Sequence, residues 1–378
     1  MAYFDHNATT PPTEAALAAF ASAQAEGWRN PSSPTREAAR VRARLEGVRV
    51  RFSELFAVEP ESLVFTSGAT EANNAVFAHL ARECPGCRVL LSPVEHPSVQ
   101  EAAELHFPGN VEFLGGDTEG VVSPKALGEV LAVEPPALVS VMAANNETGV
   151  LQPWSALAAV CREHGTLFHC DATQWVGKLP LEGLGSCDFF TASAHKFGGV
   201  KGVGLLKTPP DLRFLVGGEQ ETGRRAGTEN YPGVAAMLAA LEDALAALPL
   251  SSDGRDVFEK TLPAVLPGLR FLGAEAPRLP HVSALVMPTF DNLRWVGKLE
   301  KLGHETSTGS ACASGKVGVS PAALASGLSK EEAGRVVRVS GSRLTGFRDW
   351  NDLSRAFLQA HDELESSSGS EGSEILSV

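Results

Sequence analysis

Two stretches of the chain decide its fold: Leu167-Phe-His-Cys-Asp171-Ala-Thr-Gln174 and Asp188-Phe-Phe-Thr-Ala-Ser193-Ala-His195-Lys196. Each is a short apolar run, typical of a buried strand, that ends in polar residues. Parallel strands buried on both faces are normally apolar, so polar side chains collect at their carboxyl ends, where open α/β sheets bind ligands. Asp171 and Lys196 are therefore expected to meet at one edge of a sheet.

A carboxylate and a primary amine at such an edge match the needs of pyridoxal phosphate. Its aldehyde forms an imine with a lysine, and its ring nitrogen pairs with an anion. Taken singly, Asp171 or Lys196 would equally suit a solvated strand end or an ordinary ion pair. Gln174, Ser193 and His195 add polar groups to the same two segments, and this favours a ligand site.

Apolar runs rich in β-branched residues recur between stretches of helical periodicity. This alternation predicts an α/β fold with a mostly parallel, seven-stranded sheet covered by helices on both faces. The expected strands are 63–66, 88–91, 111–114, 137–142, 167–170, 188–191 and 202–206. The expected helices are 14–26, 34–56, 70–83, 97–106, 123–133 and 154–164.

The chain has 378 residues, which suits a large domain plus a smaller one. After an N-terminal arm over 1–15, the large domain is expected to span 16–248 and to end in an alanine- and leucine-rich helix. Residues 249–254 have the composition of a junction. A smaller α+β C-terminal domain is expected over 249–365, with strands at 269–272, 281–287 and 336–340 and helices at 291–302 and 349–364. The serine- and glycine-rich stretch 366–378 is predicted to be a disordered tail.

The composition is that of a soluble globular protein, with 43% hydrophobic and 20% charged residues. No apolar run approaches the roughly 20 residues of a membrane span, and the first residues lack a signal-peptide pattern, so a cytoplasmic location is expected. A formal net charge of −13 argues against nonspecific binding to nucleic acid or anionic membranes. The arginines between Arg36 and Arg51 are interpreted as the solvated face of a helix.

Six cysteines occur, at positions 84, 87, 161, 170, 187 and 312. In a chain of this size they fit a reducing compartment better than a disulfide framework. Cys84-Pro-Gly-Cys87 has metal-binding spacing, but a structural zinc site needs about four ligands and no second pair accompanies it. The pair is interpreted as a turn, and no metal is predicted.

Three further segments place polar residues after expected strands. One of them, Phe65-Thr-Ser-Gly-Ala-Thr70-Glu71, fits a strand followed by a turn and a helix that begins at Thr70. The first N–H groups of such a helix would suit a phosphate. Ser and Thr also cap helices where no ligand binds. His96 could stack on a planar ring and transfer protons, or be merely hydrogen bonded. Asn146 could bind a ring hydroxyl or a substrate carboxylate, or belong to an Asn-rich turn.

In this order, the segments resemble those of fold-type I pyridoxal-phosphate enzymes of the class V aminotransferase group, and within it the cysteine desulfurases. The resemblance covers most of the chain. The matching motifs are Asp5-His-Asn-Ala-Thr-Thr-Pro11, Arg29-Asn-Pro-Ser-Ser33, Thr66-Ser-Gly-Ala-Thr-Glu71, Glu95-His96, Asn145-Asn-Glu-Thr-Gly149, His169-Cys-Asp-Ala-Thr-Gln174, Ser193-Ala-His-Lys196, Arg224-Arg-Ala-Gly-Thr-Glu-Asn230 and Gly309-Ser-Ala-Cys312.

The resemblance implies a role for each matching residue around the cofactor. Lys196 would be the Schiff-base lysine, Asp171 the partner of the ring nitrogen, and His96 the ring-stacking acid or base. Gln174 would meet the ring hydroxyl. The phosphate would be held in a homodimer with shared active sites, and the residues implied around it are Ala69, Thr70, Ser193, His195 and, from the neighbouring subunit, Thr228.

The resemblance also implies how a substrate would be held and what would react with it. Asn146 and Arg338 would grip a substrate carboxylate, which the planar fork of an arginine matches. Cys312 lies in a segment of small residues that packs poorly as core, so an exposed thiol is expected. In the resembling family, the matching thiol takes the sulfur of L-cysteine as a persulfide and leaves alanine.

The activity that the resemblance implies would supply sulfur to an acceptor or scaffold protein, for iron–sulfur cluster assembly or thio-modification. Two alternatives remain: a selenocysteine lyase or related aminotransferase, and a catalytically inactive sulfur-relay protein. Two departures from the family pattern put the local geometry in doubt, because Glu219 replaces a usual glycine and Val200 a usual proline.

Overall fold

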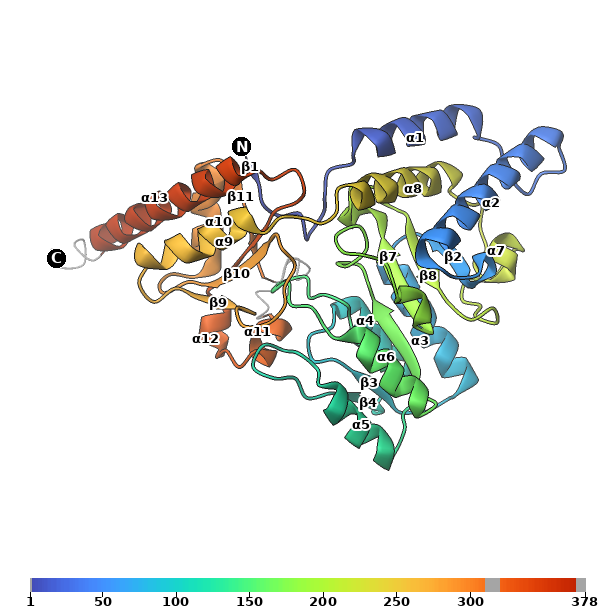
Figure 1. Ribbon diagram of the computed structural model, residues 1–378, viewed down its shortest axis with the longest axis horizontal. Helices are drawn as coiled ribbons and strands as arrows, with labels where there is room; N and C mark the ends of the chain where they lie inside the picture. Colours follow the sequence, from blue (N-terminus) through green and yellow to red (C-terminus); the bar gives the residue numbers. More distant parts are fainter. Residues whose placement is uncertain (1, 310–319, 372–378) are drawn as a thin grey trace.

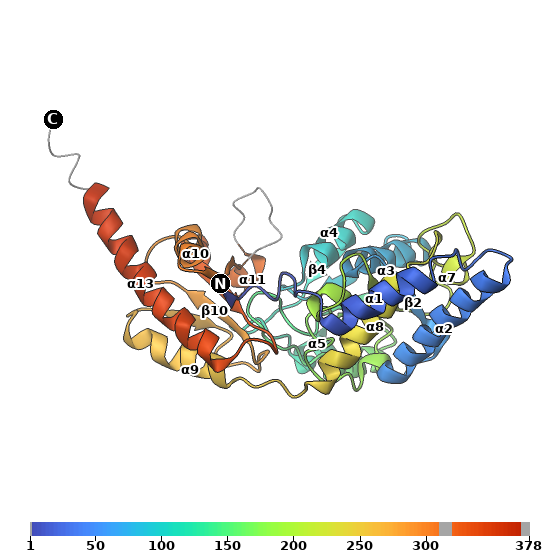
Figure 2. The same cartoon turned by 90° about the horizontal axis from the view of Figure 1, so that it is seen from above.

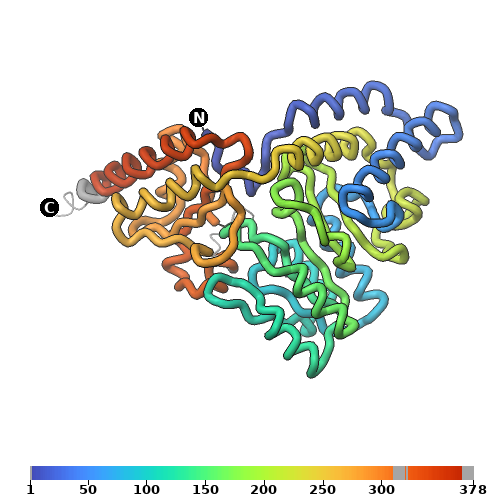
Figure 3. Tube along the Cα trace, in the orientation of Figure 1, coloured from blue at the N-terminus to red at the C-terminus, as the bar shows by residue number. Residues whose placement is uncertain are grey.

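The computed structural model describes residues 2–309 and 320–371. Figure 1 shows two bodies, one built on a seven-stranded sheet and the other on a four-stranded sheet. In Figure 3 the chain passes between them near its N-terminus and again after α8 (Tyr231–Ala246). The first body contains the strand ends on which the candidate site depends.

The larger sheet has the strand order β2-β8-β7-β6-β5-β3-β4. All neighbours pair in parallel except β8, which runs antiparallel to both β2 and β7. The predicted α/β class and the mostly parallel, seven-stranded sheet are therefore confirmed. The strands are β2 (Leu63–Thr66), β3 (Val89–Leu91), β4 (Val111–Phe113), β5 (Leu138–Ser140), β6 (Leu167–Asp171), β7 (Phe189–Ser193) and β8 (Gly204–Lys207).

Both faces of this sheet are buried, because successive strand residues point to opposite sides. Phe190 packs into a core with helices α1 (Glu14–Glu26), α2 (Arg36–Phe56), α5 (Pro124–Val133), α6 (Trp154–Glu163) and α8. The adjacent Phe189 packs into a second core with α3 (Ala69–Glu83) and α4 (Pro97–His106). The apolar runs that predicted the strands are explained by this double burial.

The smaller sheet is antiparallel, with the order β12-β13-β10-β9, from Ser307–Thr308, Val336–Ser340, Val282–Val286 and Arg270–Leu272. Helices α9 (Asp253–Thr261), α10 (Asn292–Lys301) and α13 (Phe347–Glu371) cover it with Phe258, Trp295 and Phe357. The short helices α7 (Gln220–Gly223), α11 (Pro321–Ala325) and α12 (Lys330–Ala333) complete the α-helices of the described ranges.

The N-terminal segment is part of this second body before it reaches the first. Strand β1 (Ala2–Tyr3) pairs in parallel with β11 (His304–Glu305), and Phe4 is fully buried beside Trp350, with ring centroids 5.0 Å apart. Figure 2 shows the segment leaving the smaller body for α1. Residues 5–10 consequently cross the junction between the two bodies, next to the candidate site.

Three expectations from the sequence need correction. The predicted disordered tail is wrong for residues 366–371, because α13 continues to Glu371 and Ser366 Oγ donates to the carbonyl of Asp362. Residues 372–378 lie outside the described ranges. Cys84 and Cys87 flank a turn after α3, as predicted, but a disulfide that the sequence did not predict joins them, with their Cα atoms 5.6 Å apart.

The third correction concerns the arginines of α2. Arg49 does not lie on a solvated face: its side chain is 7% exposed and makes hydrogen bonds of 2.8 and 2.9 Å to both carboxylate oxygens of the buried Glu221. Helical spacing alone does not reveal a partner far away in the sequence.

Within the described ranges, none of the helices has the length and apolar character needed to cross a membrane.

Candidate active site

A cleft of about 590 Å³ opens at the carboxyl ends of the parallel strands. It is lined by the turn before α3, by the residues that follow β6 and β7, by Arg338 of β13, and by Asn7 to Thr9 of the N-terminal segment. The predicted residues that it brings together are Ala69, Thr70, His96, Asn146, Asp171, Gln174, Ser193, His195, Lys196 and Arg338.

Two predicted residues are not part of this arrangement. Thr228 is exposed and does not line the cleft of its own chain. Cys312 lies outside the described residues. Its described neighbour Gly309 reaches the site, since its carbonyl accepts a hydrogen bond of 3.2 Å from Arg338.

Lys196 follows β7 in a single 3-10 turn, Ala194–Lys196, that directs its amine into the cleft. Its Nζ donates to the carbonyl oxygens of Asn7 at 2.7 Å and Ala8 at 2.8 Å. The strand end and the N-terminal segment therefore hold the amine together. A primary amine in this position could form a covalent bond with an aldehyde.

Asp171 is the last residue of β6 and is 4% exposed. Its Oδ1 accepts from the backbone N–H of Thr173 at 3.0 Å, and its Oδ2 accepts from the Asn73 amide at 2.9 Å. Both oxygens of the side chain act as hydrogen-bond acceptors, as those of a carboxylate do. Asp171 can therefore supply the anion that a protonated ring nitrogen requires.

The N-terminus of α3 offers a site for a phosphate. Its N-cap is Gly68, which has no side chain to take up the first N–H groups of the helix, so these remain available to an anion. Ser193 lies beside this turn: a Cβ built on Gly68 would stand 3.6 Å from its hydroxyl. Glu71 orders the turn by accepting from the Ser67 N–H at 2.8 Å and pairing with Arg225 at 2.8 Å.

His195 is held in the neutral form near this cradle. Burial, followed by the charges of Lys196, Lys201 and Lys178, lowers the pKa of His195 to about 4. Its Nδ1 lies 3.2 Å from the hydroxyl of Thr9. A neutral imidazole can still donate one N–H to a phosphate oxygen.

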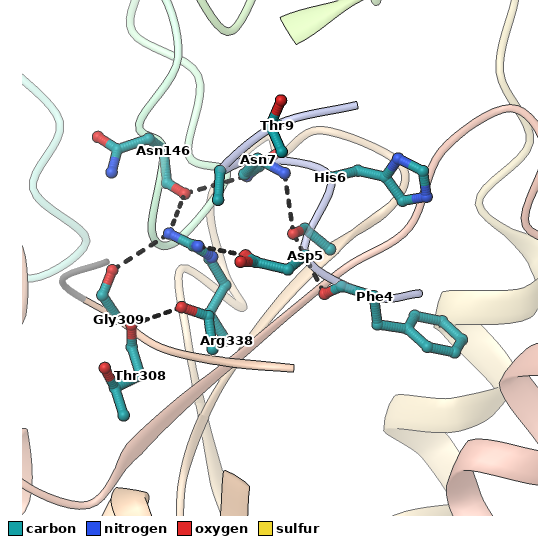
Figure 4. Close-up of polar contacts among 12 residues, drawn as sticks. Phe4, Asp5, His6, Asn7, Thr9, Asn146, Thr308, Gly309 and Arg338 are labelled. Atoms are coloured by element: carbon teal, nitrogen blue, oxygen red, sulfur yellow. Dashed lines mark hydrogen bonds and ion pairs between the residues drawn. The ribbon is translucent and has the colours of Figure 1, made fainter. Parts of the chain in front are cut away.

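Arg338 of β13 also lines the cleft and is 1% exposed. Figure 4 shows its guanidinium among Asp5, Asn146 and Gly309. One terminal nitrogen is 2.5 Å from Asp5, and the other donates to the carbonyls of Asn146 at 3.3 Å and Gly309 at 3.2 Å. Its Nε has no hydrogen-bond partner among the described residues. The sequence did not reveal that a carboxylate of the N-terminal segment neutralises this guanidinium.

Lys178 is a further lysine beside the site, and no sequence pattern indicated it. Its amine is buried and donates to Gln174 and, at 3.0 Å, to the side chain of Asn7. Burial, followed by the charges of Lys196 and Arg338, lowers the pKa of Lys178 well below its usual value. Gln174 also donates to the Asn7 carbonyl at 2.9 Å, so both side chains are fixed on the N-terminal segment.

The departures at Glu219 and Val200 leave this geometry intact. Glu219 is exposed, and Val200 packs half-buried against the main core. The amine, the carboxylate and the free helix N–H groups together provide the groups that pyridoxal phosphate requires for its aldehyde, ring nitrogen and phosphate. The donor set of the cleft therefore fits this cofactor.

Comparison with known proteins agrees with this geometry. The family model Aminotransferase class-V matches residues 2–345. A cysteine desulfurase of Enterobacter agglomerans is 36% identical, covering 92% of this chain and 89% of its own length, and one of Klebsiella pneumoniae is 37% identical, covering 91% and 88%. These matches extend through both bodies of the fold.

Solved structures give the same result. A NifS-like protein has a TM-score of 0.85 at 27% identity, and a NifS-like protein of Rickettsia africae has 0.84 at 26%; each comparison covers 96% of this chain and 99% of the other. SspA, solved in complex with cysteine, has a TM-score of 0.78 at 27% identity, covering 91% and 99%. The chain therefore belongs to the cysteine desulfurase family of the class-V aminotransferases.

Proposed function

We propose that this protein is a pyridoxal-phosphate-dependent cysteine desulfurase that converts L-cysteine to L-alanine and passes the sulfur onward. The observation that carries the proposal is that Lys196 and Asp171 line one cleft together with the N-terminus of α3 and a buried arginine. Iron–sulfur cluster assembly or thio-modification would use the sulfur.

The bound cofactor would supply an electron sink for the carbanion formed when the α-proton of the substrate leaves. Asp171 would keep the ring nitrogen protonated, because its own oxygens are held as acceptors by Asn73 and Thr173. The Lys196 amine would move the α-proton, since the Asn7 and Ala8 carbonyls hold it inside the cleft.

The substrate carboxylate would bind at Arg338 and Asn146. Arg338 already shares a hydrogen bond with Asp5, so a second carboxylate would have to use its remaining N–H groups or displace Asp5. The buried position of the guanidinium strengthens either interaction, because little water competes for it. A short α-amino acid would suit a cleft that is lined both by a lysine amine and by a guanidinium for its carboxylate.

Cys312 would accept the sulfur. As a thiolate it would attack the substrate sulfur, forming an S–S bond while the C–S bond breaks, and alanine would leave after reprotonation. The other cysteines outside the Cys84–Cys87 pair are buried, and burial raises the pKa of Cys161 to about 12 and that of Cys170 well above its usual value. These thiols suit sulfur transfer poorly.

Incubation of the cofactor-loaded protein with L-cysteine tests the proposal. We expect alanine to form and mass spectrometry to locate one added sulfur atom on Cys312. The Cys312→Ser variant should keep the visible absorbance of the cofactor but carry no added sulfur, whereas Cys161→Ser should behave like wild type. A protein that forms no alanine would contradict the activity, and undiminished sulfur transfer by Cys312→Ser would contradict the assignment of the acceptor.

A second experiment addresses the cofactor itself. Lys196→Ala should lose the visible absorbance that pyridoxal phosphate gives to the wild type, because the amine that binds the aldehyde is gone. Lys201→Ala, which removes another lysine of the same cleft, should retain it. A wild type that stays colourless after addition of the cofactor would favour an inactive sulfur-relay protein instead.

The assembly and location belong to the same proposal. The protein would act in the cytoplasm as a homodimer, with Thr228 of each subunit completing the phosphate site of the other, and would deliver sulfur to an acceptor or scaffold protein. The exposed position of Thr228, outside the cleft of its own chain, supports this arrangement.

A further inference from the structure

We propose that Asn73 and Ser98 are positioning residues that join Asp171 to His96 and hold the His96 imidazole with its proton on Nε2. The inference rests on the proposed function, because Asp171 and His96 would lie on the same bound cofactor. Asn73 lies on α3, Ser98 is the second residue of α4, and Asp171 ends β6, so three elements meet in these contacts.

The Asn73 amide has one orientation that satisfies all its neighbours. Its side chain is fully buried and lies 2.9 Å from Oδ2 of Asp171. An ionised carboxylate only accepts hydrogen bonds, so the atom that faces it must be the amide nitrogen. The amide oxygen then accepts from the hydroxyl of Thr191 at 2.8 Å, and the second hydrogen of the nitrogen points to Ser98 Oγ at 2.9 Å.

Ser98 connects the Asn73 amide to the His96 imidazole through hydrogen bonds. Because Ser98 Oγ accepts from Asn73, its single hydrogen is available for donation, and Nδ1 of His96 lies 2.8 Å away. The backbone N–H of Ser98 donates to the same nitrogen at 3.1 Å. A nitrogen that accepts two hydrogen bonds through its lone pair carries no proton, so the neutral ring is protonated on Nε2.

This tautomer determines whether His96 can donate or accept a proton. Protonation of Nδ1 would break both hydrogen bonds from Ser98 and leave an N–H in the first turn of α4 without its acceptor. His96 therefore acts as a fixed hydrogen-bond donor through Nε2 and does not collect a proton from the substrate. That task falls to Lys196, whose amine lies in the same cleft.

Nuclear magnetic resonance of the cofactor-loaded protein labelled with [15N]histidine tests the proposal directly. The His96 signals are assigned by their loss in His96→Asn, and we expect Nε2 to carry hydrogen and Nδ1 to have a free, hydrogen-bonded lone pair. A ring protonated on Nδ1, or on both nitrogens, at neutral pH would overturn the proposal. Alanine formation and cofactor colour do not enter this readout, so failure of the tautomer and failure of the proposed activity are distinguishable.

Matched variants test whether the hydrogen bond between Asn73 and Ser98 affects the one between Ser98 and His96. Asn73→Leu removes the donor to Ser98 Oγ, which weakens the hydroxyl as a donor, so the Nδ1 signal should shift. It should also lower the affinity for pyridoxal phosphate about tenfold or more, since Asp171 loses a charge-assisted hydrogen bond. Ser98→Ala should shift the Nδ1 signal of His96 but leave the affinity for pyridoxal phosphate unchanged. Ser98→Thr, which keeps a hydroxyl, should return the Nδ1 signal to its wild-type position.

Asn74→Leu is the control, because this neighbouring asparagine donates instead to the Thr70 carbonyl of its own helix. In this variant, the Nδ1 signal of His96 should have the same chemical shift as in the wild type. An unchanged Nδ1 signal in both Asn73→Leu and Ser98→Ala would show that His96 is oriented independently of Asp171, and this would contradict the proposal.

Discussion

At the scale of single residues, a buried carboxyl group lies directly before His96 and has no part in the proposed chemistry. Glu95 precedes His96 and is fully enclosed; its Oε1 accepts from the Ser92 hydroxyl and the Met142 N–H, each at 2.6 Å, while Oε2 has no partner among the described residues. Burial, together with the charge of Asp171, raises the pKa of Glu95 to about 8.

A pH dependence of stability follows from this shift. Between the ordinary value of 4.5 and about 8, folded Glu95 keeps a proton that the unfolded chain releases, so the unfolded state binds fewer protons. The free energy of unfolding should therefore fall as pH rises through this window. Glu95→Gln removes the titration while its amide oxygen can keep both hydrogen bonds, so its stability should fall less between pH 6 and 8.

Urea unfolding at several pH values measures this difference, with Glu101→Gln on the exposed side of α4 as the control. The control should follow the wild-type curve. Parallel curves for the wild type and Glu95→Gln would show that Glu95 is already ionised in the folded protein.

The residues that the sequence revealed and those that it did not differ in a physical way. Asp171 and Lys196 stand out as a pair, because each ends an apolar run and parallel strands bring such ends to one edge of the sheet. Asn73 and Lys178 do not, because their partners come from other elements and no local pattern encodes a buried hydrogen bond. Asp5 shows the same limit, since its ion pair joins the first strand region to β13.

At the scale of elements, the loop that carries Thr228 is anchored to the large body by one buried ion pair. Glu221 makes hydrogen bonds to the Arg49 guanidinium of α2 and accepts from the Phe65 N–H of β2 at 3.0 Å. Burial alone would lower the pKa of Arg49, but the hydrogen bonds and charge of Glu221 raise it further than burial lowers it. The pair therefore fixes the loop to two elements of the core.

Removal of one partner should be strongly destabilising. Glu221→Gln removes the buried carboxylate partner of Arg49 and leaves the exposed Glu46, 2.9 Å from the arginine Nε, so we expect a loss of about 3 kcal/mol in the free energy of unfolding. Glu242→Gln breaks the exposed pair with Arg51 and should change it by less than about 1 kcal/mol. Chemical denaturation of both variants measures the contrast, and equal effects would mean that burial does not set the strength of these pairs.

Helices and strands of the large body were predicted closely because their faces are buried in a regular period. The smaller body was harder to predict. Helix α9 begins at Asp253, within the expected junction 249–254, and was not predicted. Strands β1 and β11 have two residues each, and their pairing joins residues about 300 positions apart in the chain. Short pairings of this kind depend on tertiary contacts such as those of Phe4, which leave no periodic signal.

At the scale of the whole molecule, the N-terminal segment connects the two bodies through the site. Phe4 belongs to the core of the smaller body, Asp5 pairs with Arg338, and the carbonyls of Asn7 and Ala8 hold Lys196. Because Arg338 belongs to the smaller body and Lys196 to the larger one, a displacement of one body relative to the other would change the distance between the proposed substrate arginine and the lysine. The relative position of the two bodies is therefore part of the proposed active site.

The shared site of the proposed homodimer predicts complementation between two defective subunits. Thr228→Val homodimers should bind pyridoxal phosphate more weakly, and Lys196→Ala homodimers should give no visible absorbance. In a mixed dimer, the site that retains Lys196 would receive its Thr228 from the Lys196→Ala subunit, because that subunit is intact at position 228. Half of the sites should then regain wild-type affinity, measured by titrating the visible absorbance of affinity-purified mixed dimers. If Thr228 instead served its own chain, the Lys196-bearing site would keep the valine, and the mixed dimer would bind as weakly as the Thr228→Val homodimer.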